Sequence, residues 1–252
     1  MKADYDLNYV KLAPLYDAFM EGIDYEEWVS YVEEIIDKFG GHVHKVADLA
    51  CGTGNSTFPW ALRGYRTWGI DLSAEMLKIA RMKAEEKQLK IEFLCQDLRR
   101  MHLEESVNLA VCFQDGFNYL LNPRDLEEAF KAVYRNLTKE GLFIFDLNYL
   151  PRIVPQDNEI SFIDDDRCSM AWRSRFLEEE QVWEIEVKGQ IKKLPAGENT
   201  FYEKHKERIY ETGEVWSLLT AQNFTILGTY QAFTFNPPHH QTSKIVFVAQ
   251  KV

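Results

Sequence analysis

The sequence is poor in cysteine. Its 252 residues include only four, which are Cys51, Cys95, Cys112 and Cys168. No two of them form a CxxC pair, and no histidine stands nearby at the spacing of a zinc site, so the sequence predicts no metal centre. Three of the four lie in or beside strands that we expect to be buried, where cysteine acts as a small apolar core residue.

Long apolar runs are also missing. No window approaches the roughly 18 apolar residues of a membrane helix. The first residues, MKADYDLNYVK, lack the basic and then apolar build of a signal peptide. We therefore expect a cytoplasmic protein without a membrane partner.

Positive charge is scarce as well. The formal net charge is -11 at pH 7, and the pI is near 5.1. A surface that binds nucleic acid needs lysine and arginine to displace counterions from the phosphate backbone. Nucleic acid is therefore a disfavoured partner, and a small molecule is the favoured one. The oligomeric state is left open, a homodimer included.

The first 148 residues alternate between strand and helix patterns. An amphipathic helix is predicted over residues 25–39, followed by helices after Asn55, from Ser73 to about Lys87, and over 125–136. Apolar strands are predicted at 46–50, 67–70, 91–94, 107–113 and 142–147. Short apolar strands separated by helices indicate an α/β fold, a doubly wound parallel sheet covered on both faces. Ligands of such sheets bind at the C-terminal ends of the strands.

The pattern changes after Tyr149. Three longer alternating stretches follow, at 169–176, 182–192 and 200–210, with a turn at Pro195 to Asn199. They predict an antiparallel sheet inserted into the parallel fold. A helix at about 212–222 and strands at 225–233 and 244–249 then close the core. We expect residues 1–148 and 209–252 to form the cofactor-binding core and residues 149–208 to form an acceptor lid.

The stretch VADLACGTGN, residues 46–55, carries the most chemistry. A buried strand runs into a turn with Gly52 and Gly54 and then into a helix. Glycines let the backbone approach a ligand closely, and a helix N-terminus offers free N–H groups. A tight turn without a ligand remains the alternative for this segment alone.

Acidic residues follow three successive strands. Asp71 ends the second strand, where a carboxylate can accept both hydroxyls of a ribose, and Asp97 follows the third strand, within reach of an adenine amino group. NAD would also suit Asp71, but Thr57 stands where the dinucleotide motif has its third glycine. Asp48 precedes the glycine turn and would repel a pyrophosphate while attracting an ammonium group. Together these residues favour a positively charged nucleoside ligand.

The sequence resembles the class I S-adenosylmethionine-dependent methyltransferases through DLACGTG, GIDLSAEML, CQDL and LFIFDLN. The likeness covers nearly the whole chain except the inserted strands, and N-terminal YD and DYxxW segments extend it to amino-sugar N-methyltransferases. It implies a Rossmann-like, seven-stranded sheet with an antiparallel last strand and S-adenosylmethionine as cofactor. The cofactor contacts that it implies are Asp48, Ala50, Gly52, Gly54 and Phe113 at the methionine end, Asp71 with Leu72 at the ribose, and Asp97 and Leu98 at the adenine.

Two further sets of residues are candidates for the site. Tyr16 and Tyr25 are expected to close over the cofactor, since an aromatic face attracts a sulfonium; anchoring the N-terminal helix is the alternative. The candidates for aiming the acceptor or moving its proton follow the fourth and fifth strands or lie in the inserted sheet. They are Asp115, Asn118, Tyr119, Asp146, Asn148, His205 and Arg208. A wet strand face is the alternative for His205 and Arg208.

The sequence therefore predicts transfer of a methyl group from S-adenosylmethionine to a nitrogen or oxygen of a small molecule. Two other functions stay open at this point. An NAD-dependent oxidoreductase would share the glycine turn and Asp71, and a catalytically silent module that binds S-adenosylmethionine would share every feature.

Overall fold

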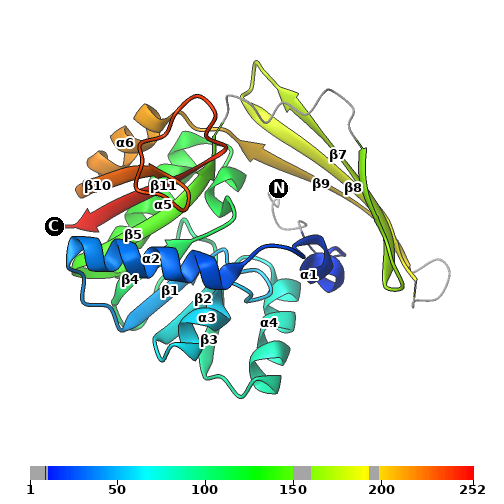
Figure 1. Ribbon diagram of the computed structural model, residues 1–252, viewed down its shortest axis with the longest axis horizontal. Helices are drawn as coiled ribbons and strands as arrows, with labels where there is room; N and C mark the ends of the chain where they lie inside the picture. The colour runs from blue at the N-terminus through cyan, green and yellow to red at the C-terminus, as the bar shows by residue number, and fades with distance from the viewer. Residues whose placement is uncertain (1–8, 10, 150–159, 193–198) are drawn as a thin grey trace.

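The computed structural model describes residue 9 and residues 11–149, 160–192 and 199–252. Its largest element is a seven-stranded sheet in the order β10-β11-β5-β4-β1-β2-β3 (Figure 1). The strands are β1 (Lys45–Leu49), β2 (Arg66–Asp71), β3 (Ile91–Cys95), β4 (Val107–Cys112), β5 (Leu137–Asn148), β10 (Phe224–Gln231) and β11 (Lys244–Lys251). Strands β1 to β5 pair in parallel, and β11 runs antiparallel to both β5 and β10. The predicted mostly parallel sheet with an antiparallel last strand is confirmed.

The helices alternate with these strands. They are η2 (Ala13–Leu15), α1 (Tyr16–Phe19), α2 (Tyr25–Phe39), α3 (Thr57–Leu62), α4 (Ala74–Glu86), η3 (Gly116–Tyr119), α5 (Pro123–Asn136) and α6 (Thr212–Ala221). Polar side chains fix the starts of three helices by accepting a hydrogen bond from a free amide of the first turn. They are Asp24 at α2, Ser73 at α4 and Asn122 at α5.

Each central strand is buried on both faces, because helices cover both sides of the sheet. On one side α2 packs its buried Trp28 and Val32 against Val46 and Ile144. On the other side α5 packs Phe130 against Phe143, the strand neighbour of Ile144. Successive strand residues point to opposite faces, so this arrangement is the doubly wound one. It leaves the C-terminal strand ends as the open edge.

The second sheet is antiparallel and has the order β6-β7-β8-β9. Its strands are β6 (Ile160–Asp164), β7 (Cys168–Leu177), β8 (Val182–Ile191) and β9 (Thr200–Arg208). The sequence predicted the last three. It missed β6, whose five residues form an edge strand paired only with β7 among the described strands. The turn predicted at 195–199 lies outside the described residues, apart from Asn199.

The N-terminal segment joins the two sheets. In Figure 1, α1 lies between the core and the curved face of the antiparallel sheet. Leu12 and Leu15 pack with Met170, Val187 and Phe201 of that sheet. Within the described residues, no helix is both long and apolar enough to cross a membrane, and no group of acidic, histidine and cysteine side chains is placed to hold a metal ion.

Candidate functional site

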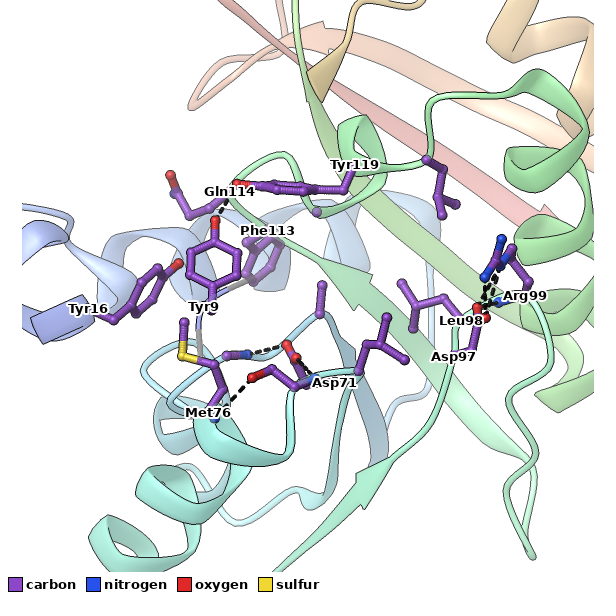
Figure 2. Close-up of a pocket in the computed structure, with 16 residues that line it drawn as sticks. Tyr9, Tyr16, Asp71, Met76, Asp97, Leu98, Arg99, Phe113, Gln114 and Tyr119 are labelled. Atoms are coloured by element: carbon purple, nitrogen blue, oxygen red, sulfur yellow. Dashed lines mark hydrogen bonds and ion pairs between the residues drawn. The ribbon is translucent and has the colours of Figure 1, made fainter. Parts of the chain in front are cut away.

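A cavity opens at the C-terminal ends of β1 to β4, the edge where the sequence predicted a ligand. Figure 2 shows its lining residues, with Tyr9 and Tyr16 on one side, the pair Asp97 and Arg99 on the other and Asp71 between them. The full lining is Tyr9, Tyr16, Ala50, Gly52, Asp71, Leu72, Ser73, Met76, Asp97, Leu98, Arg99, Phe113, Gln114, Gly116, Tyr119 and Leu120. Most of the predicted cofactor contacts are in this wall.

The turn after β1 brings backbone into the cavity. Ala50 and Gly52 have left-handed φ angles of 53° and 54°. The Gly52 amide donates a hydrogen bond of 2.8 Å to Oδ2 of Asp71, and a Cβ at Gly52 would lie 3.5 Å from the Tyr16 ring. Glycine is therefore favoured at Gly52 because the turn is left-handed and a side chain would narrow the cavity.

Asp71 is fixed by two backbone amides. Its Oδ2 accepts from Gly52, and its Oδ1 accepts a bond of 2.8 Å from the Ser73 amide. Burial raises the pKa of this carboxyl, and its amide hydrogen bonds counteract the rise. Each carboxylate oxygen has a further lone pair, so the group can still accept hydroxyl hydrogens from a ligand.

Asp97 is paired with a residue that the sequence analysis missed. The Arg99 Nε lies 2.9 Å from Oδ1 and 3.0 Å from Oδ2 of Asp97, and the Arg99 amide also donates to Oδ1. Burial raises the pKa of Asp97, but the bonds from Arg99 outweigh it and the pKa is lowered. The carboxylate is therefore held ionised and oriented at this end of the cavity.

Asp48 and Gly54 lie behind the wall of the cavity. Asp48 is fully buried and accepts hydrogen bonds of 2.7 Å and 2.5 Å from the hydroxyls of Ser56 and Thr57. Burial raises its pKa to about 7. A Cβ at Gly54 would lie 2.8 Å from the Phe58 ring. Neither residue is in the cavity wall, and their direct ligand contacts stay predictions: Asp48 holds the start of α3, and Gly54 lets α3 pack closely.

The segment after β4 is bent into the cavity. Gln114 and Asp115 have left-handed φ angles of 57° and 56°, a conformation that costs non-glycine residues energy. A Cβ at Gly116 would lie 2.7 Å from Cβ of Ala50. This close approach lets η3 sit directly on the turn after β1. Phe113, at the start of the bend, stacks on Trp28 with ring centroids 5.0 Å apart.

Three tyrosines close one side of the cavity. The hydroxyls of Tyr9 and Tyr119 hydrogen-bond to each other, and the rings of Tyr9 and Tyr16 meet edge to face at 5.5 Å. Burial raises the pKa of all three well above the ordinary value, so their hydroxyls are neutral. Tyr25 lies elsewhere, in a separate surface hollow with Asp17 and Asn55, and lines neither this cavity nor the next.

A second cavity lies on the other side of these tyrosines. Tyr9, Tyr16, Gln114 and Tyr119 line both cavities. The rest of its wall comes from the N-terminal segment, the bend after β4 and strands β8 and β9. These residues are Leu12, Phe19, Met20, Ile23, Asp115, Ile185, Val187, His205 and Glu207. The inserted sheet and the core therefore form this cavity together.

Asp115 belongs to a charge cluster at the strand ends. Lys244 Nζ lies 2.6 Å from Oδ1 of Asp115 and 2.7 Å from Oδ2 of Asp146, and the Asp115 amide donates to Asp146. Asp146 is fully buried and lines neither cavity; it fixes Asp115 and Lys244, and its contact with the acceptor stays a prediction. Burial raises the pKa of Asp146, and Lys244 counteracts the rise.

Alternation along β9 separates His205 from Arg208. His205 and Glu207 point inward and line the second cavity. Arg208 points the other way, where its guanidinium pairs with Glu214 of α6 at 3.1 Å and stacks on Tyr210. Arg208 lines neither cavity, and its contact with the acceptor stays a prediction. Two other predicted residues, Asn118 and Asn148, brace this region: Asn118 donates to the Arg208 carbonyl, and Asn148 donates to Glu207.

The chain is similar to known methyltransferases over its whole length. Residues 46–141 match the family described as methyltransferase domain. A protein of Geobacillus sp. (strain WCH70) that is named as a methyltransferase is 30% identical over 252 residues, which cover 97% of this chain and 100% of the relative.

Solved structures give the same result. The crystal structure of an S-adenosylmethionine-dependent methyltransferase from Clostridium acetobutylicum has a TM-score of 0.82 at 29% identity and covers 96% of this chain and 98% of its own. CalS10, an amino pentose methyltransferase from Micromonospora echinaspora with bound S-adenosylmethionine, shares the fold with a TM-score of 0.74 at 18% identity, covering 94% and 97%. The glycine turn, the carboxylates along the first cavity and these likenesses agree, and the chain belongs to the S-adenosylmethionine-dependent methyltransferases.

Proposed function

We propose that the first cavity binds S-adenosylmethionine and that the second binds a small molecule whose nitrogen or oxygen receives the methyl group. The observation that carries this proposal is the wall that the two cavities share, made by Tyr9, Tyr16, Gln114 and Tyr119. A donor in one cavity and a nucleophile in the other would meet at this wall. Methyl transfer needs the reacting atoms about 3 Å apart and aligned, so positioning is most of the catalysis.

The residues along the first cavity are arranged in an order that matches the successive parts of the cofactor. Asp97 and Leu98 lie at one end, which suits adenine; Asp71 lies in the middle, which suits the ribose; and the tyrosines lie at the other end, which suits the methionine part (Figure 2). Gly52 lies beside Tyr16 at this last end. When bound, the cofactor supplies an electrophilic methyl group on a positively charged sulfonium. The neutral aromatic faces of Tyr9 and Tyr16 stabilise a cation beside them.

A small acceptor is supported by the composition of the second cavity and by charge. Buried Leu12 and Val187 and the polar groups Asp115 and Glu207 face the same space, a mixture typical of small-molecule sites. The net charge of -11 disfavours nucleic acid. We also infer the division of labour that the sequence predicted: residues 1–148 and 209–252 hold the cofactor, and residues 149–208 cover the acceptor. CalS10, an amino pentose methyltransferase, supports a small acceptor by its fold.

The test has two parts. Calorimetric titration should show binding of S-adenosylmethionine and S-adenosylhomocysteine and none of NAD. Incubation with methyl-labelled S-adenosylmethionine and a cell extract, separated into small-molecule and macromolecular fractions, should place the label in the small-molecule fraction. Label in nucleic acid or protein would contradict the small acceptor, and absence of S-adenosylhomocysteine binding would contradict the assignment of the first cavity.

A further inference from the structure

The second cavity has more acidic side chains around it than cations among the described residues. Asp115 lines the cavity, and Lys244, its partner, also donates to the buried Asp146. Glu207 lines the same cavity and, among the described residues, makes no ion pair. One ammonium group is therefore shared by two carboxylates, and a third carboxylate beside them lacks a cation of its own.

Neutral hydrogen-bond donors hold Glu207 in place. Glu207 is only 5% exposed to solvent. Asn148 Nδ2 donates to Oε2 of Glu207 at 3.1 Å, and the Tyr119 hydroxyl also hydrogen-bonds to this carboxylate. Tyr119 is bonded in turn to Tyr9. These contacts orient the carboxylate toward the cavity without neutralising it.

His205 is an independent sign that the cavity takes a polar molecule. It is 3% exposed and lines the cavity beside Glu207. Its Nε2 lies 3.3 Å from Oε2 of Glu203, whereas its Nδ1 makes no hydrogen bond with the described residues. Its ring lies against Tyr9, with centroids 4.6 Å apart. A buried imidazole nitrogen without a hydrogen bond destabilises the folded protein, and a polar group of a bound ligand would supply the missing hydrogen bond to Nδ1.

The following inference rests on the proposed function and makes its acceptor specific. We propose that the acceptor is a small molecule with a protonated amine, and that Glu207 binds this ammonium group and accepts its proton. An ammonium has no lone pair and cannot attack a methyl group, so an amine acceptor needs a proton acceptor in contact with it. Glu207 is the acidic side chain that lies in the cavity and makes no ion pair with the described residues.

The proposed step balances in charge and electrons. Binding of the ammonium first displaces to solvent the proton that Glu207 holds at neutral pH. The ammonium then transfers one of its own protons to the Glu207 carboxylate and becomes a neutral amine. The nitrogen lone pair then forms the new N–C bond while the C–S bond breaks, and the electron pair of that bond stays on sulfur. The product leaves as a methylated ammonium, and the proton on Glu207 returns to solvent.

Several groups face Glu207 and set its proton affinity. Burial raises its pKa first, Asp115 raises it further, and Lys244, Asn148 and Tyr119 lower it, which leaves the pKa at about 8. The remaining neighbours that titrate are Tyr9 and, along the same strand, His205. A carboxylate with this pKa accepts a proton near neutral pH far more readily than an ordinary glutamate.

Calorimetry with two matched probes tests the inference. The full-length protein is saturated with S-adenosylhomocysteine and titrated at pH 7 with 2-phenylethylamine and with 2-phenylethanol, each in two buffers of different ionisation heat. We expect the amine to bind more tightly than the alcohol and to release close to one proton. In Glu207→Gln the amine should lose about tenfold in affinity and release no proton.

Glu186→Gln is the matched control. Glu186 lies on β8 but on the face opposite to the cavity residues Ile185 and Val187, where it pairs with Arg173. This variant should keep the affinity and the proton release of the parent. If S-adenosylhomocysteine fails to bind the parent, the proposed function is wrong; if it binds and the amine does not, or binds no better than the alcohol, only the amine acceptor is wrong.

A second measurement uses the parent protein alone, so it does not depend on whether Glu207→Gln folds. Proton release by the amine should fall toward zero as the buffer pH rises above 8, because Glu207 is then ionised before the ammonium arrives. Release that stays constant through this range, or that persists in a folded Glu207→Gln protein, would show that the released proton comes from another group.

Discussion

Nζ of Lys244 lies 2.6 Å from Oδ1 of Asp115, although 129 positions separate the two residues in the chain. The antiparallel course of β11 brings the first residue of that strand to the C-terminal ends of β4 and β5. A reversed strand beside the parallel strands thus supplies a lysine where those strands supply carboxylates. The lysine therefore gives Asp115 an ion-pair partner beside the second cavity.

Lys244→Met should destabilise the fold strongly. It leaves the fully buried Asp146 without a cation, and removing one partner of a buried pair costs roughly 3–5 kcal/mol. Urea denaturation at pH 7 measures the change in the free energy of unfolding. Lys192→Met, which breaks an exposed pair with Asp164, should cause no measurable loss. Adding Asp146→Asn to Lys244→Met should restore part of the stability, and a double variant no better than the single one would contradict this account.

Asp71→Asn should weaken binding of S-adenosylmethionine by roughly 1–3 kcal/mol, because it removes charge-assisted acceptors at the proposed ribose position. Calorimetric titration gives the affinity directly. Asp37→Asn makes the same chemical change on the exposed side of α2 and should leave the affinity unchanged. Equal affinities in Asp71→Asn and the parent would remove the ribose assignment.

Asp48 should make stability depend on pH. Its pKa is about 7 in the folded protein, whereas an ordinary aspartate has a pKa of roughly 3.9. Between these values the folded state binds more protons than the unfolded state, so the free energy of unfolding falls as pH rises from about 4 to 7 and the loss is complete above 7.

Asp48→Asn should remove this slope, which reaches at most roughly 1.4 kcal/mol per pH unit. Urea denaturation of parent and variant from pH 4 to 8, without cofactor, measures the two slopes. Curves that run parallel across this range would mean that Asp48 is an ordinary ionised aspartate in the folded protein.

Gly116→Ala should separate η3 from the turn after β1. The new Cβ would lie 2.7 Å from Ala50 Cβ and from Cys112 Sγ, and overpacking of this kind costs roughly 1–3 kcal/mol. Binding of S-adenosylhomocysteine should weaken as well, because Ala50 is in the cavity wall. Gly213→Ala is the control: a Cβ there meets nothing within 4 Å, and in helix α6 it should be neutral or stabilising by up to about 1 kcal/mol. Equal thermal unfolding temperatures for both variants would refute the argument.

The parallel core could be predicted because its signals are local. A buried strand, a glycine turn and a capped helix follow one another within about a dozen residues, and the end of each strand then fixes where Asp71 and Asp97 lie. Strand β6 was missed because ISFID is short and its residues are half exposed, so no apolar pattern distinguishes it from a loop.

The second cavity could not be predicted, because it depends on which residues from distant segments meet. Alternation along β9 indicates that His205 and Arg208 point to opposite faces, but it does not say which face is inward. Glu207 lies on the same inward face as His205, but the sequence pattern alone does not identify that face as the inward one. Lys244 becomes visible only once the pairing of β11 with β5 is known. Tyr9 stands in a segment without any periodic pattern.

Glu203 links the N-terminal segment to strand β9. Its two oxygens accept hydrogen bonds of 2.9, 2.7 and 2.9 Å from the amides of Tyr9, Lys11 and Leu12. The strand that carries Glu203 also carries His205 and Glu207 on the same face. An outward swing of β9 would therefore lift Tyr9 off the first cavity and withdraw Glu207 from the second in one movement. The position of Tyr9 at the first cavity and that of Glu207 at the second therefore depend on one strand.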